Sequence, residues 1–113
     1  MTEQDYKTGA EILEGLYALI EGRKGADPET SYTASLFGDG REKIAKKVTE
    51  EAAETVFAAL NETPDRVASE SADVLYHLLV LWVDAGVVPA DVWIELAKRR
   101  GTSGIDEKRS RPP

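Results

Sequence analysis

Residues 41–85 decide the fold, and they read REKIAKKVTEEAAETVFAALNETPDRVASESADVLYHLLVLWVDA. Helix-forming residues dominate this stretch, and no alternation typical of a β-strand persists in it. The tripeptide Thr63–Pro64–Asp65 interrupts it with a capping residue, a proline suited to the first helical position and an acid suited to the positive helix end. The sequence therefore predicts two long helices, 41–61 and 64–85, which run antiparallel because their connection is short.

Each of these two helices carries a pair of acidic residues three positions apart, Glu51 with Glu54 and Glu70 with Asp73. Residues with this spacing share one face of a helix. Glu54 lies nine positions before Thr63 and Asp73 lies ten after it, so the four carboxylates should meet at a similar height. Like charges held this close need a cation between them, and carboxylate oxygens suit Mg²⁺ or Mn²⁺. The four acids are therefore candidate metal ligands. Glu51 and Glu54 alone are also typical of a solvated helix face, and Glu70 and Asp73 alone could simply compensate the helix dipole.

The second helix is apolar on almost every side between Val74 and Val83, which predicts a deeply buried helix or one shared with a partner subunit. Three of its acids, Glu70, Asp73 and Asp84, nevertheless form one narrow stripe together with His77. Burying an unpaired carboxylate costs several kcal/mol. Arg66 is the last basic residue on this helix, so we expect a metal ion to balance the stripe.

Three residues near the acids are candidates for supporting roles. His77 could ligate the ion, but a histidine that holds a carboxylate by a hydrogen bond or completes the core is commoner, and we expect that role. Lys43 and Lys47 share the acidic face and are candidate phosphate ligands. The alternative for the lysines is ordinary pairing with acids four positions further along the helix.

The rest of the chain is predicted to contribute shorter helices at residues 5–21 and 89–99 and a short helix or turn at residues 31–37. Gly22–Pro28 is a loop by composition, and Gly38–Asp39–Gly40 ends the second of these helices. The predicted fold class is all-α, an antiparallel helical domain over residues 1–100. Residues 101–113 are expected to form an extended or flexible basic tail.

The chain has 113 residues, a net charge of −7 and no cysteine. This length fits one domain, and a helical chain this small often dimerises to bury more surface. The negative charge argues against a protein that binds nucleic acid or anionic membranes through bulk charge. The absence of cysteine excludes disulfides, thiol nucleophiles and cysteine-ligated metal sites.

No targeting or membrane segment is predicted. Residues 1–16 lack the basic region and apolar run of a signal peptide. The longest apolar stretch, 74–83, is interrupted by His77 and is too short to span a bilayer. We therefore expect a soluble, cytoplasmic protein.

Three stretches of the chain carry a family resemblance, and they read SYTASLFGDGREKIAKKVTEEAAETVFAAL (31–60), ESADVLYHLLVLWVDAGV (70–87) and LAKRRGTSGIDEKRSR (96–111). Over about residues 9–111 the chain resembles the phosphoribosyl-ATP pyrophosphatases of histidine biosynthesis. The pattern EExxE followed by ExxD is shared with the wider all-α nucleoside-triphosphate pyrophosphatases of the MazG type. The words KIxxKVxEEAxE, ADxLYHLLVL and GxSGxxEK are more specific to the phosphoribosyl-ATP family.

The resemblance implies hydrolysis of phosphoribosyl-ATP to phosphoribosyl-AMP and pyrophosphate, the second step toward histidine. It implies Mg²⁺ as cofactor and a homodimer with four-helix-bundle cores. It also implies a stand-alone enzyme, because this chain has neither the length nor the cysteines of the zinc-dependent cyclohydrolase to which some relatives are fused.

Carried onto this chain, the resemblance assigns roles to particular residues. The metal ligands are the acids of the two pairs, Glu51, Glu54, Glu70 and Asp73. Glu50 belongs to the same motif and would either orient the attacking water or bind a second ion, and both roles stay open. Independently of the resemblance, the positive charges of Lys43, Lys47 and Arg41 make them the residues expected to hold the β- and γ-phosphates or the leaving pyrophosphate.

Two other functions stay open. A house-cleaning pyrophosphatase acting on dUTP or damaged nucleotides would use the same acidic chemistry, although GTSGIDEK at 101–108 favours the histidine pathway. A non-catalytic helical dimerisation module would explain the apolar residues 74–83 but gains nothing from Glu70 and Asp73. A ferritin-like carboxylate protein is excluded because its Glu-x-x-His pairs are missing.

Overall fold

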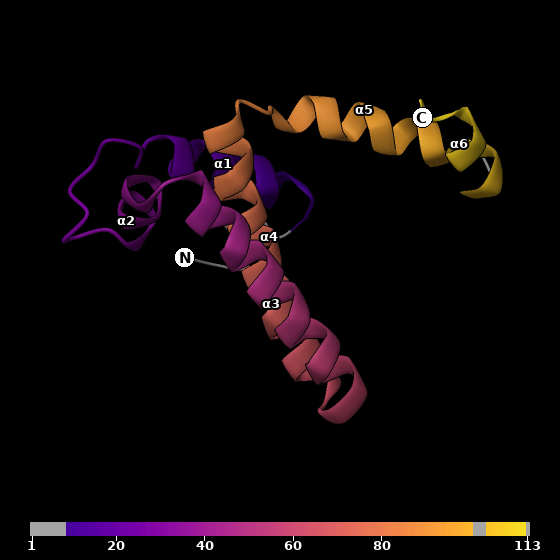
Figure 1. The fold of residues 1–113 in the computed structure, drawn as a ribbon, viewed down its shortest axis with the longest axis horizontal. Helices are drawn as coiled ribbons and strands as arrows, with labels where there is room; N and C mark the ends of the chain where they lie inside the picture. The colour runs from indigo at the N-terminus through magenta and orange to yellow at the C-terminus, as the bar shows by residue number, and fades with distance from the viewer. Residues whose placement is uncertain (1–8, 101–103, 113) are drawn as a thin grey trace.

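A computed structural model describes residues 9–100 and 104–112, and within them the only regular elements are helices, as the sequence predicts (Figure 1). The elements in chain order are α1 (Glu11–Glu21), α2 (Tyr32–Asp39), α3 (Arg41–Asn61), α4 (Pro64–Ala85), α5 (Pro89–Arg100) and α6 (Gly104–Ser110).

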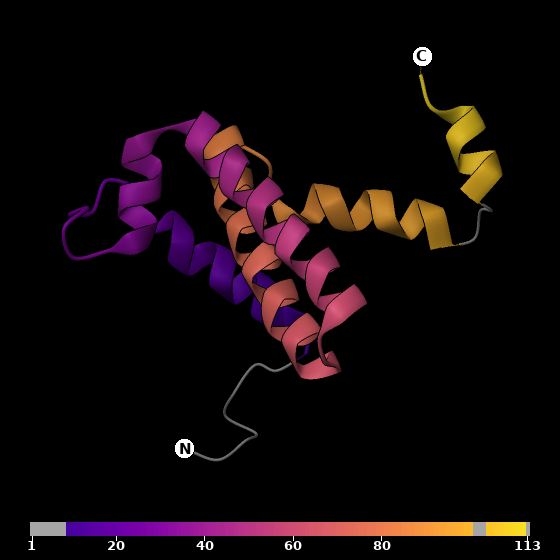
Figure 2. The same ribbon diagram turned by 60° about the horizontal axis from the view of Figure 1, so that its bottom comes forward.

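Helices α3 and α4 form an antiparallel hairpin that is the central element of the fold, and both views show them side by side (Figures 1 and 2). The corner between them, residues 62 and 63, is short because the next helix is capped at once. The Thr63 side chain accepts a hydrogen bond from the Arg66 backbone N–H at 3.4 Å, and Pro64 takes the first helical position. The predicted helix bounds and corner are confirmed.

The hydrophobic core lies at the end of the hairpin away from the corner. Its buried side chains come from all four of the first helices, namely Ile20, Leu36, Ile44, Leu79, Val80 and Val83. Helix α1 packs against α4, and its Tyr17 hydroxyl donates to the backbone carbonyl of Val87, just beyond the end of α4, at 2.9 Å. The N-terminal half of α4 and the C-terminal half of α3 therefore project beyond the core toward the corner.

Helix α5 leaves this body as an arm (Figures 1 and 2). Trp93 near its start donates from Nε1 to the Glu14 carboxylate at 3.0 Å and packs edge-on against Trp82. Further along the arm, Ile94 and Leu96 are more than half exposed. Among the described helices, none alone is long and apolar enough to cross a membrane, and only α4 and α5 together, which meet at a bend of 116°, reach that length and hydropathy.

Some boundaries differ from those predicted. The first helix begins at Glu11 rather than residue 5, although residues 5–8 of that prediction lie outside the described part of the chain. Helix α2 continues to Asp39, and Gly40, at φ 97°, is the residue that ends it. Residues Gly104–Ser110 form a short helix where an extended tail was expected, while 101–103 and 113 lie outside the description.

Gly86 ends α4 in the left-handed region, at φ 77° and ψ 23°. A Cβ at this position would meet no atom within 4 Å, so a side chain there costs backbone strain only. We expect Gly86→Ala to lower the free energy of unfolding by about 1–2 kcal/mol, measured by urea denaturation at fixed protein concentration. Gly38→Ala is the matched control, because Gly38 is helical and equally uncrowded. That control should be neutral or stabilising by up to about 1 kcal/mol, and equal losses in both variants would contradict the assignment of strain to Gly86.

Candidate functional site

The hairpin brings three of the four predicted metal ligands together. Oxygen atoms of Glu51 on α3 and of Glu70 and Asp73 on α4 lie within 4.8 Å of one another. Glu51 and Glu70 are buried, with 8% and 7% of their surface exposed, whereas Asp73 is exposed. Two carboxylates are thus held in the helix interface with a third at its edge, and this carboxylate cluster has the donor set of a site for a hard divalent cation.

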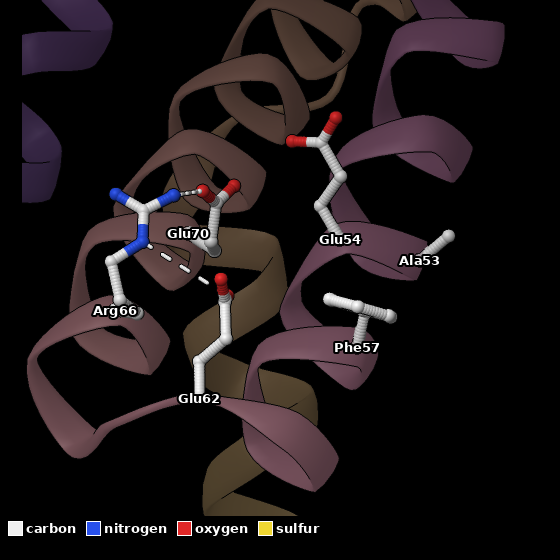
Figure 3. Close-up of a pocket in the computed structure, with 6 residues that line it drawn as sticks. All are labelled: Ala53, Glu54, Phe57, Glu62, Arg66 and Glu70. Atoms are coloured by element: carbon white, nitrogen blue, oxygen red, sulfur yellow. Dashed lines mark hydrogen bonds and ion pairs between the residues drawn. The ribbon is translucent and has the colours of Figure 1, made fainter.

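Glu70 tests whether the cluster fits a metal ion. Arg66, one turn earlier on α4, donates to its Oε1 at 2.6 Å (Figure 3). Its Oε2 is buried and has no hydrogen-bond partner. Leaving a buried carboxylate oxygen unpaired is costly, so this atom requires a ligand. A cation at the carboxylate cluster would satisfy it.

Glu54, the fourth predicted ligand, is exposed and is not part of the carboxylate cluster. Its side chain points from α3 into a cavity of about 400 Å³ at the corner end of the hairpin, facing Glu70 on the other helix (Figure 3). It therefore borders the same space as Glu70 but does not converge with Glu51 and Asp73.

Lys47 lies one turn before Glu51 on α3, toward the core end of the hairpin. Its ammonium is 3.4 Å from a Glu51 oxygen and 3.8 Å from a Glu50 oxygen. The hydrogen bond with Glu51 raises the pKa of Lys47 above its usual value and outweighs the opposing effect of burial. In this structure Lys47 pairs with acids of its own helix. This pairing is the alternative to phosphate binding that the sequence leaves open. Lys43 is exposed one turn earlier on α3.

Arg41 lies far from the cluster. Its guanidinium donates to the Asp84 carboxylate and to the Asp84 backbone carbonyl, each at 2.7 Å. It precedes Glu51 by ten residues, or about 15 Å along the helix axis. The structure thus ties α3 to the end of α4 through Arg41 and does not bring this residue to the carboxylates. Asp84, part of the predicted acidic stripe, finds its partner here rather than in a metal.

Both ring nitrogens of the buried His77 are engaged. Nδ1 is 2.8 Å from the Asp73 backbone carbonyl, and Nε2 is 2.9 Å from the Tyr32 hydroxyl. A carbonyl can only accept, so Nδ1 carries the proton and Nε2 accepts from Tyr32. His77 therefore has no free lone pair for a metal and acts by fixing the turn that carries Asp73.

The sequence alone did not single out Arg66 as a partner of Glu70, nor Tyr32 as a partner of His77. Arg66 and Glu70 stand four positions apart on one helix, a spacing that favours an ion pair and could have been noticed. Tyr32 reaches the site only through the packing of α2. The pKa of its phenol is raised above the usual value, mainly by burial, while Lys47 opposes the shift and Glu51 and Asp73 add to it. This hydroxyl therefore lies within the field of the carboxylate cluster.

Comparison with known proteins gives one consistent family. Residues 13–100 match the phosphoribosyl-ATP pyrophosphohydrolase family. A phosphoribosyl-ATP pyrophosphatase of Paramagnetospirillum magneticum is 66% identical over 102 residues, which cover 90% of this chain and 94% of the relative. Proteins of the same name from Rhodospirillum rubrum and Azospirillum brasilense are 63% and 61% identical, covering 91% and 93% of this chain and 88% and 95% of their own lengths. The chain belongs to the phosphoribosyl-ATP pyrophosphohydrolase family.

His77 is the chain's only histidine, so its tautomer can be read directly in ¹⁵N-labelled, tag-free protein. For the neutral ring, we expect the long-range ¹H–¹⁵N spectrum to show a protonated Nδ1 and an unprotonated Nε2. Tyr32→Phe should shift the Nε2 signal without changing the tautomer, because the bond to Asp73 remains. Tyr17→Phe, which removes a hydroxyl bonded elsewhere, is the control. A proton on Nε2 in the unaltered chain would contradict the assigned hydrogen bonds.

Proposed function

We infer that this protein hydrolyses phosphoribosyl-ATP to phosphoribosyl-AMP and pyrophosphate, the second step of histidine biosynthesis. The observation that carries this function is the carboxylate cluster, in which a buried Glu70 oxygen without a partner lies beside Glu51 and Asp73. It occurs in a chain whose residues 13–100 match the family named for this reaction. A charged nucleotide does not cross a bilayer unaided, so we place the reaction in the cytoplasm.

We propose Mg²⁺ as the cofactor, held by Glu51, Glu70 and Asp73. Glu54 borders the same space and is the fourth ligand once its side chain turns toward the cluster. When bound, the ion supplies charge neutralisation for phosphate oxygens and lowers the pKa of a bound water. Arg66 holds the Oε1 oxygen of Glu70, which would leave the buried Oε2 available as the ligand atom.

The chain's own residues supply the remaining roles. To Glu50, half-buried beside Glu51, we assign the role of orienting the attacking water and accepting its proton. Lys47 and Lys43 occupy successive turns on the same side of α3 and hold the leaving pyrophosphate by charge. Arg41 takes no part in this scheme, since Asp84 holds it at the far end of the hairpin. His77 and Tyr32 keep the turn around Asp73 in place.

We propose that a second copy of the chain covers the apolar flank of the hairpin and forms a four-helix core. The apolar flank is a shallow hollow of about 380 Å³ lined by Ala52, Thr55, Ser71, Val74 and Leu75. Two large apolar side chains of α3 beside it, Val56 and Leu60, are 58% and 78% exposed. Adjacent exposed apolar groups of this size mark an interaction surface. An antiparallel hairpin can pair with its own copy through one self-complementary flank, as a twofold dimer requires.

Glu51→Gln and Asp73→Asn test the proposed site, because each removes one ligand charge at constant shape. We expect each to lower kcat for pyrophosphate release from phosphoribosyl-ATP by at least about 100-fold, the effect of losing one strong electrostatic stabiliser of ~3 kcal/mol. Mg²⁺ should raise the melting temperature of the unaltered protein and have a smaller effect on either variant.

Glu42→Gln is the matched control, an exposed acid on the same helix outside the site. It should leave kcat and the Mg²⁺ effect unchanged. Near-normal turnover by Glu51→Gln, or failure of the unaltered enzyme to release pyrophosphate, would falsify the proposed site or the proposed reaction respectively.

Val56→Asp tests the homodimer by placing a charge on the apolar flank. Burying an unpaired carboxylate costs several kcal/mol, so the dissociation constant of the dimer should rise by at least about 100-fold. Sedimentation velocity over a range of concentrations measures the change. Ala18→Glu, a charge on the exposed side of α1, should leave the dimer intact. A monomeric unaltered protein would refute the dimer without touching the carboxylate cluster.

A further inference from the structure

A cavity lies at the corner end of the hairpin, next to the carboxylate cluster but with its own lining (Figure 3). We call it the corner cavity. Its lining residues are Ala53, Glu54, Phe57, Glu62, Arg66 and Glu70. Its volume, about 400 Å³, falls within the range of small-molecule sites. The phosphate-binding and metal-binding roles proposed above leave Phe57 and Glu62 without a function.

The corner cavity carries a net negative charge. Three of its lining side chains are carboxylates and one is a guanidinium. Arg66 is already committed, 2.6 Å from Glu70 and 4.0 Å from Glu62. A phosphate inside this cavity would meet repulsion, whereas a cation would be attracted, so the 5′-phosphate on the N1-linked ribose of phosphoribosyl-ATP must lie outside it. The Phe57 ring, 59% exposed at the cavity, adds an aromatic surface of the kind that binds cations.

The order of side chains along α3 indicates which end of the substrate lies toward the core and which lies toward the corner. Lys47 lies one turn before Glu51, and Phe57 lies six residues after it, or about 9 Å in the opposite direction. If the lysine side holds the leaving pyrophosphate, the nucleoside must extend past the cluster toward the corner. A ribose spans this separation and brings the base beside Phe57 and Glu62.

The base of phosphoribosyl-ATP differs from that of ATP in charge. A ribosyl group on N1 of adenine converts the ring into an amidinium-like cation at neutral pH, whereas the adenine of ATP is neutral. We propose that the corner cavity recognises this positive charge, with Phe57 offering its ring face and Glu62 its carboxylate. The inference rests on the proposed function and names the feature of the substrate that selects it over ordinary adenine nucleotides. Phe57 and Glu62 are then specificity-determining residues.

The test compares two product-like probes on the full-length, Mg²⁺-loaded protein, 1-methyladenosine 5′-monophosphate with a cationic ring and AMP with a neutral one. Calorimetry should show the methylated probe binding about tenfold tighter, the range expected for one cation–π contact plus one partly exposed charge pair. Glu62→Gln should remove most of this preference, and Phe57→Leu should reduce it. The control Glu42→Gln should retain it.

Kinetics with phosphoribosyl-ATP gives a second readout. Glu62→Gln should raise KM with little change in kcat, because the charge contact is made equally in the bound substrate and the transition state. Equal binding of the two probes to the unaltered protein overturns the inference, as does an unchanged preference in both folded variants. An unaltered enzyme that releases pyrophosphate from phosphoribosyl-ATP yet does not distinguish the probes retains its proposed function and loses only this inference.

Discussion

The burial of Glu51 and Glu70 between two antiparallel helices is the constraint on which the rest of the site depends. Each carboxylate has one basic neighbour on its own helix, Lys47 at 3.4 Å for Glu51 and Arg66 at 2.6 Å for Glu70. Asp73 is the third carboxylate of the cluster. The three carboxylates of the cluster thus have two basic neighbours, Lys47 and Arg66. The flanking bases make the carboxylates tolerable in the folded chain, and the remaining imbalance leaves a place for a cation.

The position of the core explains why one end of the hairpin is packed and the other is open to a ligand. Buried apolar side chains gather around Ile44 and Val80, at the end where α1 and α2 pack. Among the described residues, those that line the corner cavity come from α3, α4 and the link between them, and Phe57 and Glu62 are exposed there. The carboxylate cluster lies between these two regions, with one side held by packing and the other accessible.

Most of the helix bounds and three of the four clustered or neighbouring acids could be predicted from sequence, because the deciding signals are local. Thr63–Pro64 and Gly86 define the bounds of α4, and the i, i+3 acids fix which faces meet. The Arg41–Asp84 pair joins residues 43 apart in sequence, so no pattern within one helix could reveal it. Glu54 is exposed and stands apart from the other three acids, which the i, i+3 spacing alone does not reveal. Helix α6 has only seven residues, a length at which propensity alone predicts no stable helix.

The corner between α3 and α4 contains only Glu62 and Thr63. So brief a link has little slack with which to absorb a change in chain length. One residue gained or lost inside either helix, between Glu54 and Glu70, would turn one set of ligands by about 100° against the other. Selection on this enzyme should therefore act on indels in this segment as strongly as on the identity of the acids. The loop between α1 and α2, which supplies none of the carboxylates, is where length is free to drift.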